Sequence, residues 1–470
     1  MIGDVVNIRV SFHHLCPLLE GGSDNQRVAI FLQSRHQLAA KFDRRSTVRG
    51  APLHGTERRG NPEGVFKRQR HESSIIVNWF GRMSYKAGRH FLQLPGPTNV
   101  PDRILHAIAN PTIDHRSADF AALTTTCLEG MKAVFQTKGD VVIFPGSGTG
   151  AWEAALVNTL SAGDKVLAFD SGHFAGLWVK VAKNFGLNVD LIGGDWRCGA
   201  DAEALAARLS EDSSHEIRAV MVVHNETSTG VTSDIAAVRR ALDAAGHPAL
   251  LMVDTVSSLG SIDYRHDEWR VDVAVAGSQK GLMLPPGLCF NTISEKAIAA
   301  SRTAMLPRSY WRWDEMREMN RKGFFPYTPA TNLLYGLREA VKMLVEEEEL
   351  PNVFCRHQRH AEATRRAVRA WGLGIFAINP AEFSPSATAI VMPEGFNEAD
   401  LRAVILRHFD MSLGAGLGKL AGKVFRIGHL GSFNDLMLAG TLCGVEMGLK
   451  LAGVPHQPGG VDAALEWLAT

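Results

Sequence analysis

Short apolar runs recur along the chain from Leu92 onward, separated by segments with helical periodicity. The runs are short and rich in β-branched side chains, as expected of strands that are buried on both faces. They are VVIF at 141–144, KVLAFD at 165–170, AVMVVH at 219–224, ALLMVD at 249–254 and VDVAVAG at 271–277. Helical patterns between them include AWEAALVNTL (151–160) and DIAAVRRALDAAG (234–246). This alternation predicts an α/β fold with a mostly parallel, doubly wound sheet.

The pattern changes after a long helix that is predicted over 333–350, in LLYGLREAVKMLVEEEEL. We therefore predict a large domain over 83–350 and a smaller C-terminal α+β domain over 351–470. Residues 1–82 differ from both domains, because they lack helical or strand periodicity and carry 11 arginines against 2 lysines. They are predicted to be a disordered extension, or sequence translated upstream of a start at Met83. A targeting arm is the alternative, which the seven acidic residues of this segment disfavour.

Charge and cysteine content exclude several classes of partner. Residues 1–82 hold 13 Lys or Arg against 7 Asp or Glu, whereas residues 83–470 hold 37 Lys or Arg against 42 Asp or Glu. The body of the chain is therefore mildly acidic and is not expected to bind nucleic acid. No segment has the roughly 18 consecutive apolar residues of a membrane helix, so no membrane contact is expected. The six cysteines are widely spaced, which favours free thiols and a cytoplasmic location. His224 and His115 have no partner at ligand spacing, so no metal site is predicted.

A glycine-rich loop, PGSGTGAWEAAL, follows the first apolar run and opens a helix. Ser147 and Thr149 offer hydroxyl groups, Gly148 lets the backbone approach a ligand, and the helix N-terminus favours an anion. The loop lacks the Lys-Ser/Thr pair of a Walker loop. It predicts a phosphate cradle, with an ordinary tight turn as the alternative.

Two ionisable residues follow neighbouring apolar runs. Asp254 ends ALLMVD, and a carboxylate that is buried there needs a cationic or protonated partner. The alternative is that Asp254 caps the helix that follows. Lys280 follows VDVAVAG, where apolar surroundings would lower its pKa, as the nucleophile that forms a Schiff base requires. The alternative is a surface lysine whose aliphatic stem is buried. Together with the cradle, these residues predict a site for pyridoxal phosphate, which needs a phosphate site, an acid at its ring nitrogen and a lysine at its aldehyde.

Seven motifs resemble those of the class V, fold-type I aminotransferases, most closely the serine–glyoxylate and alanine–glyoxylate group. They are LPGPTNVP, SGTGAWEAALVNTL, HNETSTG, LMVDTVSSLG, GSQKGLMLPPG, TPATNLLYGLRE and FRIGHLG, and they extend from about Phe91 to the C-terminal part of the chain. The resemblance implies a fold-type I architecture and transfer of an amino group from L-serine to glyoxylate, with alanine or aspartate as alternative donors. It also implies a homodimer with shared active sites.

The resemblance further implies a role for each matching residue. Lys280 would join the cofactor as a Schiff base and carry a proton, and Asp254 would pair with the ring nitrogen. Arg426 would hold the substrate carboxylate in a bidentate fork, with a structural salt bridge as the alternative. The other implied cofactor contacts are Ser147, Gly148, Thr149 and Gln279 at the phosphate, Thr227 at the phenolic oxygen, Val256 and Phe174 at the ring, and Thr328 at the phosphate of the neighbouring subunit.

Three questions remain open at this point. Relatives offer a tyrosine where this chain has Phe325, so either Tyr327 replaces it or the contact is absent. A lyase or desulfurase of the same fold would need a nucleophilic cysteine in a mobile loop, and Cys289 instead falls inside an expected strand. A non-catalytic regulator that binds the same cofactor would usually carry a helix-turn-helix, for which residues 1–82 offer no pair of periodic helices.

Overall fold

A computed structural model describes residues 88–470. The extension predicted over 1–82 lies outside the described residues. Lys86–Thr470 group into one compact unit, and the domain boundary predicted at residue 350 stays a prediction. None of the helices in residues 88–470 combines the length and the apolarity that crossing a bilayer requires.

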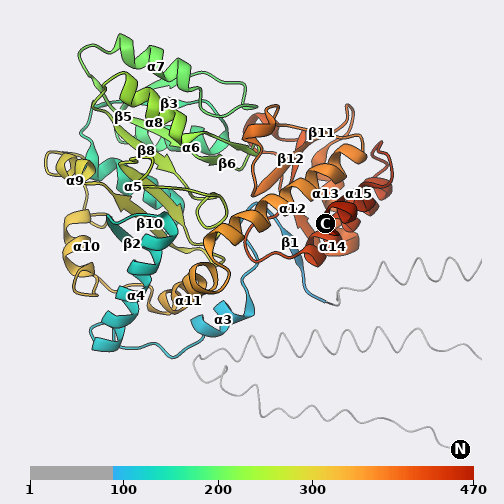
Figure 1. Ribbon diagram of the computed structural model, residues 1–470, viewed down its shortest axis with the longest axis horizontal. Coiled ribbons are helices and arrows are strands. Elements are labelled where there is room, and N and C mark those ends of the chain that lie inside the picture. Colours follow the sequence, from blue (N-terminus) through green and yellow to red (C-terminus); the bar gives the residue numbers. More distant parts are fainter. Residues whose placement is uncertain (1–87) are drawn as a thin grey trace, which may run out of the picture. The chain divides into compact units, whose positions relative to one another are not determined.

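A seven-stranded sheet forms the middle layer of the larger, left-hand part of this unit in Figure 1. Strand β10 is antiparallel to both of its neighbours, β2 and β9, and the other strand pairs are parallel. Every position of β8 and β9 is buried, as the continuous apolar runs predicted. The α/β prediction of a mostly parallel sheet is therefore confirmed. In spatial order the strands are β2 (Asp140–Gly146), β10 (Gly287–Ile293), β9 (Val273–Gly277), β8 (Leu250–Asp254), β5 (Ile217–Val223), β3 (Lys165–Phe169) and β4 (Asn188–Ile192).

Eight helices belong to this part of the described residues, and four of them begin at a side chain that accepts a backbone N–H. Ser117, Asp201, Asp234 and Ser294 cap α4, α7, α8 and α9 in this way. Helices α5 and α6 have no such cap from their own N-cap residues, Ser147 and Gly172. Their first N–H groups are therefore left for other partners. The helices of this part are α3 (Asp102–Ile108), α4 (Ala118–Phe135), α5 (Gly148–Thr159), α6 (His173–Asn184), α7 (Ala202–Glu211), α8 (Ile235–Ala244), α9 (Glu295–Ser301) and α10 (Trp313–Asn320).

The single helix predicted over 333–350 is wrong in its second half. Helix α11 (Thr331–Val341) passes into a π-helical turn, η3 (Lys342–Glu347), and α12 (Leu350–Ala370) begins only after the chain turns at Glu349, where φ is 65°. Pro351 lies in the first turn of α12, where its missing N–H costs no helical bond. Met343, Leu344 and Val345 continue the apolar pattern through the π-helical turn, and the glutamates that follow include no glycine or proline, which is why the pattern alone indicated one helix.

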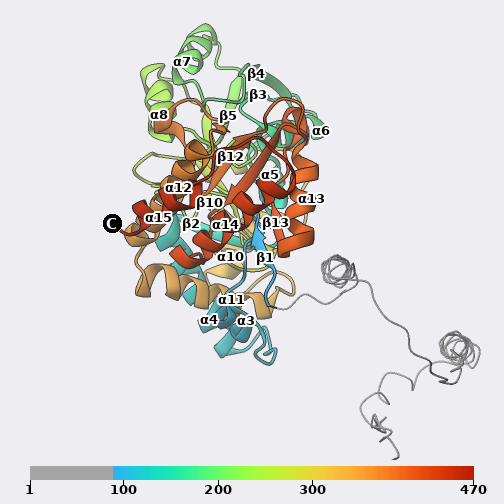
Figure 2. The ribbon, with the colours of Figure 1, turned by 90° about the vertical axis from the view of Figure 1, so that its right-hand side faces the viewer.

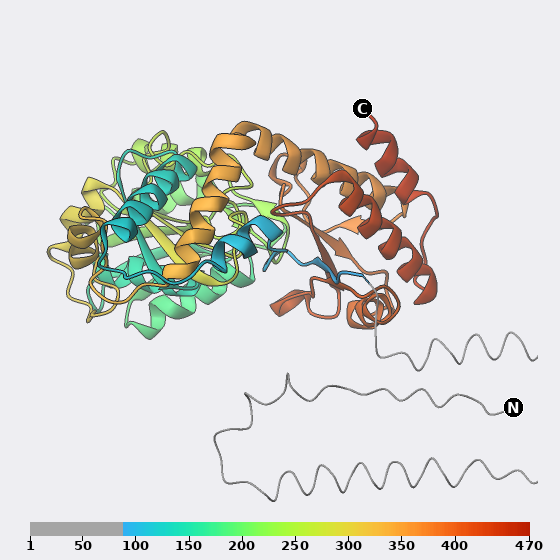
Figure 3. The same ribbon diagram turned by 90° about the horizontal axis from the view of Figure 1, so that it is seen from below.

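The C-terminal part of the chain builds a second, smaller sheet with its own apolar cluster. Strand β12 (Ala387–Val391) lies between β11 (Gly374–Ile375) and β14 (Val424–Gly428), and β1 (Phe91–Gln93) pairs with β13 (Met411–Leu413). Helix α12 runs from the seven-stranded sheet to this part (Figure 3). Figure 2 shows the smaller sheet together with α13 (Glu398–Phe409), α14 (Asp435–Leu451) and α15 (Gly460–Leu468). The cluster includes Trp371, Phe425 and Leu442.

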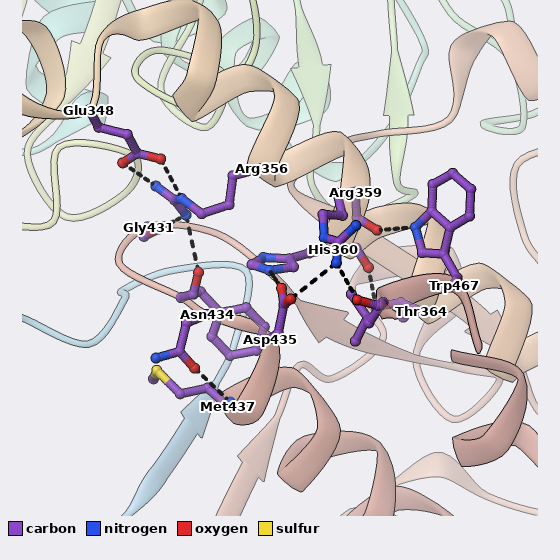
Figure 4. A network of polar contacts seen from close by, with 12 residues as sticks. Glu348, Arg356, Arg359, His360, Thr364, Gly431, Asn434, Asp435, Met437 and Trp467 are labelled. Atoms are coloured by element: carbon purple, nitrogen blue, oxygen red, sulfur yellow. Dashed lines mark hydrogen bonds and ion pairs between the residues drawn. The ribbon is translucent and has the colours of Figure 1, made fainter. Parts of the chain in front are cut away.

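A polar network ties α12 to the loop that follows β14 and to the start of α14 (Figure 4). Arg356 donates two hydrogen bonds to the carboxylate of Glu348, at 2.6 and 2.9 Å, and a third to Gly431 O at 2.8 Å. His360 Nε2 lies 2.9 Å from Asp435 Oδ1. These contacts fix the loop between β14 and α14, which follows Arg426 directly in sequence.

Buried histidines are expected to make the protein sensitive to mild acid. Burial lowers the pKa of His224 and His266 to about 4 and of His357 to about 3, and it also lowers the pKa of His360 and His429. A histidine has a pKa of about 6.5 when unfolded, so below this pH the unfolded chain takes up protons that the folded chain does not. Each such histidine then lowers the free energy of unfolding by up to about 1.4 kcal/mol per pH unit.

We therefore predict that the free energy of unfolding falls steeply between pH 7 and pH 5.5. Raised pKa values of Asp254 and Glu226 act in the opposite direction, but these are two groups against six, because burial also lowers the pKa of His247. Urea denaturation at several pH values measures the slope. A free energy that is constant over this range would contradict the prediction.

Candidate active site

The loops at the carboxyl ends of β2, β8 and β9 meet in one cavity, as expected for a ligand site in an open α/β sheet. Nine of the predicted site residues line it: Ser147, Gly148, Thr149, Phe174, Thr227, Asp254, Val256, Gln279 and Lys280. Arg426 does not line the cavity itself, but it contacts Thr227. Thr328 is exposed in the loop before α11 and is not among the lining residues; its predicted contact with a neighbouring subunit stays a prediction.

Lys280 lies in the turn after β9 and is almost fully buried, with 9% of its surface exposed. Its Nζ donates a hydrogen bond to Pro95 O at 2.8 Å, and its own carbonyl accepts one from the hydroxyl of Thr98. Burial, together with the positive charge of Arg426, lowers the pKa of Lys280 to about 8. A lysine with this pKa has a usable fraction of neutral amine near pH 7.5, as a nucleophile requires.

Asp254 ends β8 with its carboxylate held by two donors. The backbone N–H of Val256 donates to Oδ1 at 2.7 Å, and Trp152 Nε1 donates to Oδ2 at 3.0 Å. Burial raises the pKa of Asp254 to about 7 in spite of these bonds. A buried carboxyl in this condition is stabilised as an anion by a cation placed beside it. A protonated pyridine nitrogen is such a cation.

The N-terminus of α5 faces the same cavity through Ser147, Gly148 and Thr149. Ser147 makes no side-chain capping bond, so the first N–H groups of the helix remain available to an anion. A methyl group on Gly148 would come within 2.6 Å of Val256 Cγ2, so only glycine lets the helix approach this close. Gln279 Oε1 is buried without a hydrogen-bond partner among the described residues.

Arg426 lies on β14, and 7% of its surface is exposed. Its Nε donates to Ala415 O at 2.9 Å and its Nη1 donates to Thr227 O at 2.7 Å. Both acceptors are backbone carbonyls, and neither bond uses Nη2. Burial lowers the pKa of Arg426 to about 10, and the carboxylate of Glu226 opposes this shift. The geometry therefore presents a buried guanidinium beside Thr227.

The sequence did not single out four residues that the structure places at the cavity. Trp152, Asn225 and Ser257 line it, and Glu226 is buried behind Thr227. Trp152 had a weak signal, because it follows Gly148 by four residues and so lies on the same helix face. Asn225 donates to the hydroxyls of Ser257 and Ser386, 2.8 Å away in each case. No comparable spacing pointed to Asn225 or Glu226.

These groups fit pyridoxal phosphate. A free helix N-terminus with two hydroxyl side chains suits the phosphate, and Gln279, whose amide oxygen has no partner among the described residues, lines the same cavity. A buried carboxyl with a raised pKa suits a protonated ring nitrogen, and a buried amine with a lowered pKa suits an aldehyde. The aromatic ring of Phe174 lines the cavity beside them.

Comparison with known proteins places the chain in a family. The family model for class-V aminotransferases matches residues 90–417. The chain belongs to the class-V aminotransferase family. As a member of this family, the enzyme is an aminotransferase that uses pyridoxal phosphate.

Relatives of the aminotransferase span almost all of its described part. It is 51% identical over 390 residues to the serine–glyoxylate aminotransferase of Methylorubrum extorquens, an alignment that covers 82% of this chain and 97% of the relative. It is 49% identical over 375 residues to the L-aspartate–glyoxylate aminotransferase of Paracoccus denitrificans, covering 79% of this chain and 94% of the relative. The crystal structure of ureidoglycine–glyoxylate aminotransferase from Bacillus subtilis matches with a TM-score of 0.76 at 27% identity, over 83% of this chain and 100% of that one. The fold-type I prediction is thereby confirmed.

Proposed function

We propose that this aminotransferase moves the amino group of L-serine to glyoxylate, giving hydroxypyruvate and glycine. The observation that carries the proposal is a buried lysine that lines the cavity, together with a buried arginine that donates to a residue of the cavity lining. Arg426 donates to Thr227 O, and Thr227 lines the same cavity as the amine of Lys280. A guanidinium for a carboxylate and an amine for a Cα proton are what an α-amino acid substrate needs. The names of the relatives at 51% and 49% identity supply the acceptor, glyoxylate.

Lys280, Asp254 and Arg426 each have a separate role in the proposed reaction. Pyridoxal phosphate supplies the electron sink that allows an amino acid to lose its Cα proton. Lys280 is held by Pro95 O beside the cavity and, with a pKa of about 8, accepts and returns a proton near neutral pH. Asp254 is oriented by Trp152 Nε1 and Val256 N, and its carboxylate would hold the protonated ring nitrogen of the cofactor. Arg426 orients the substrate carboxylate, so that the Cα–H bond faces Lys280.

L-Aspartate is the second candidate donor, because a relative at 49% identity is named for it. We predict that L-serine gives the highest kcat/KM of serine, alanine and aspartate, each assayed with glyoxylate on the purified protein. Product analysis distinguishes hydroxypyruvate, pyruvate and oxaloacetate. A higher kcat/KM with aspartate would replace serine in the proposal and leave the aminotransferase assignment in place.

We also propose a homodimer in which Thr328 of one subunit reaches the phosphate site of the other. Thr328 is exposed, and the neighbouring Tyr327 stacks on Tyr310, whose ring is 43% exposed. Light scattering should give twice the mass of the 51.2 kDa chain. A cytoplasmic location is proposed on the ground that Cys127, Cys198, Cys289, Cys355 and Cys443 are all free thiols.

A further inference from the structure

Helix α6 carries Phe174 in its first turn, yet its own N-cap residue, Gly172, offers no side chain to the free N–H groups. These groups are satisfied from another part of the chain. Glu226 Oε2 accepts hydrogen bonds from Phe174 N and Ala175 N, both at 3.0 Å. The hydroxyl of Ser228 accepts the bond from His173 N, also at 3.0 Å. The start of α6 is therefore capped by a segment that lies more than 50 residues further along the chain.

The second oxygen of Glu226 holds the turn that follows it. Glu226 Oε1 accepts from Ser228 N at 3.0 Å and from Ser228 Oγ at 2.6 Å. Thr227 lies between these two residues and lines the cavity, and its carbonyl accepts the bond from Arg426. One carboxylate with four donors thus joins three groups of the site: the Phe174 ring, Thr227 and, through Thr227, the guanidinium of Arg426.

Charge and packing both require this carboxylate in this place. Glu226 is 1% exposed, and burial raises its pKa, while its four donors favour the ionised form. A carboxylate at a helix N-terminus is also favoured by the helix dipole. The charge of Glu226 raises the pKa of both Arg426 and Lys280, which opposes the effect of their burial.

Gly172 shows how closely the two segments approach. A methyl group on Gly172 would lie 2.3 Å from Glu226 Cγ, so the side chain of Glu226 occupies the space that any other residue at 172 would need. The backbone of Gly172 is extended, with φ of 163°, which alanine can adopt. An alanine at this position would therefore act by displacing Glu226 and not by straining the backbone.

We infer that Glu226 is a positioning residue for the cofactor: it sets the place of the Phe174 ring and of Thr227 without touching the cofactor itself. Loss of the carboxylate leaves both groups present but lets the start of α6 and the turn at 227–230 move apart. The cofactor then loses its ring contact and its contact at the phenolic oxygen together. This inference rests on the proposed use of the site, and cofactor binding measured without any substrate separates its failure from a wrong choice of amino donor.

Glu226→Gln is the test, because it preserves shape and removes the acceptor for one pair of donors. We expect the Kd for pyridoxal phosphate, measured by titrating the apoenzyme, to rise at least about tenfold. The visible circular dichroism of the bound cofactor should also weaken, since it reports the asymmetric surroundings of the ring. Gly172→Ala should produce the same two changes with the carboxylate intact, and it serves as the second variant if Glu226→Gln fails to fold.

Asp272→Asn is the matched control. Asp272 is also a buried carboxylate that accepts from a backbone N–H, of Leu251 at 2.8 Å, and from a serine hydroxyl, of Ser294 at 2.9 Å. It lies just before β9, at the sheet edge opposite Lys280. The control should lower the melting temperature and leave cofactor affinity and circular dichroism unchanged. If Glu226→Gln and Gly172→Ala behave like this control, the inference is overturned and Glu226 has only a structural role.

Discussion

The Lys280→Ala variant is expected to fold, but its rate of transamination should fall by at least about a thousandfold. General acid–base catalysis alone contributes roughly a hundred- to ten-thousandfold to the rate, and the variant also loses the nucleophilic amine. The side chain lines the cavity and donates a single bond, to Pro95 O, so its removal breaks no network in the core. Removing a buried amine with a lowered pKa also removes a desolvation cost. The melting temperature of the apoenzyme should therefore stay close to that of the parent protein.

Lys296→Ala is the matched control for Lys280. Lys296 also donates from Nζ to a backbone carbonyl, Ala249 O at 2.7 Å, but it does so at the opposite edge of the sheet. It should keep full activity. Borohydride reduction of the parent protein followed by peptide mapping should place the cofactor on Lys280. Label on a different lysine, or a Lys280→Ala variant that transaminates at a normal rate, would remove Lys280 from its assigned role.

Local pattern was sufficient to predict the sheet and five residues of the cavity lining, Ser147, Gly148, Thr149, Asp254 and Lys280, whereas the family resemblance indicated Phe174, Thr227, Val256 and Gln279. The apolar runs ending at Asp254 and Gly277 became adjacent parallel strands, and this pairing brought Asp254 and Lys280 to one edge. The rule that ligands bind at the carboxyl ends of such strands then located the site. Arg426 is different, because its place beside Thr227 depends on how β14 packs, and only the family resemblance indicated it.

The residues that sequence reasoning missed act through partners far away in the chain. Trp152 donates to Asp254 across 102 positions, and Glu226 accepts from Phe174 across 52. Neither pair has a spacing that a periodicity can reveal. The break at Glu349 was missed for a related reason, since apolar periodicity persists through the π-helical turn. The contact predicted for Thr328 involves a second subunit and stays a prediction.

The Arg426→Lys variant tests whether this residue binds the substrate carboxylate or only supports the fold. Lysine keeps the positive charge but not the planar fork that matches a carboxylate. Loss of one charge-assisted hydrogen bond costs about 1.5–3 kcal/mol, so kcat/KM should fall roughly ten- to a hundredfold for both the amino donor and glyoxylate. Affinity for pyridoxal phosphate should hardly change, because Arg426 is not among the residues that line the cofactor cavity.

Arg356→Lys is the control that separates the two roles of an arginine in this part of the fold. Arg356 makes a two-bond contact with Glu348 and holds Gly431 O, so its loss should lower the melting temperature (Figure 4). Its partners lie just before α12 and in the loop after β14, and none of them lines the cavity, so the kinetics of the variant should stay near those of the parent protein. Arg426→Lys should show the reverse: a stable protein with impaired use of both substrates. Arg426→Lys could instead lower the melting temperature and leave kcat/KM unchanged for serine and glyoxylate. In that case another residue holds the substrate carboxylate, and Arg426 serves only to join β14 to the turn at Thr227.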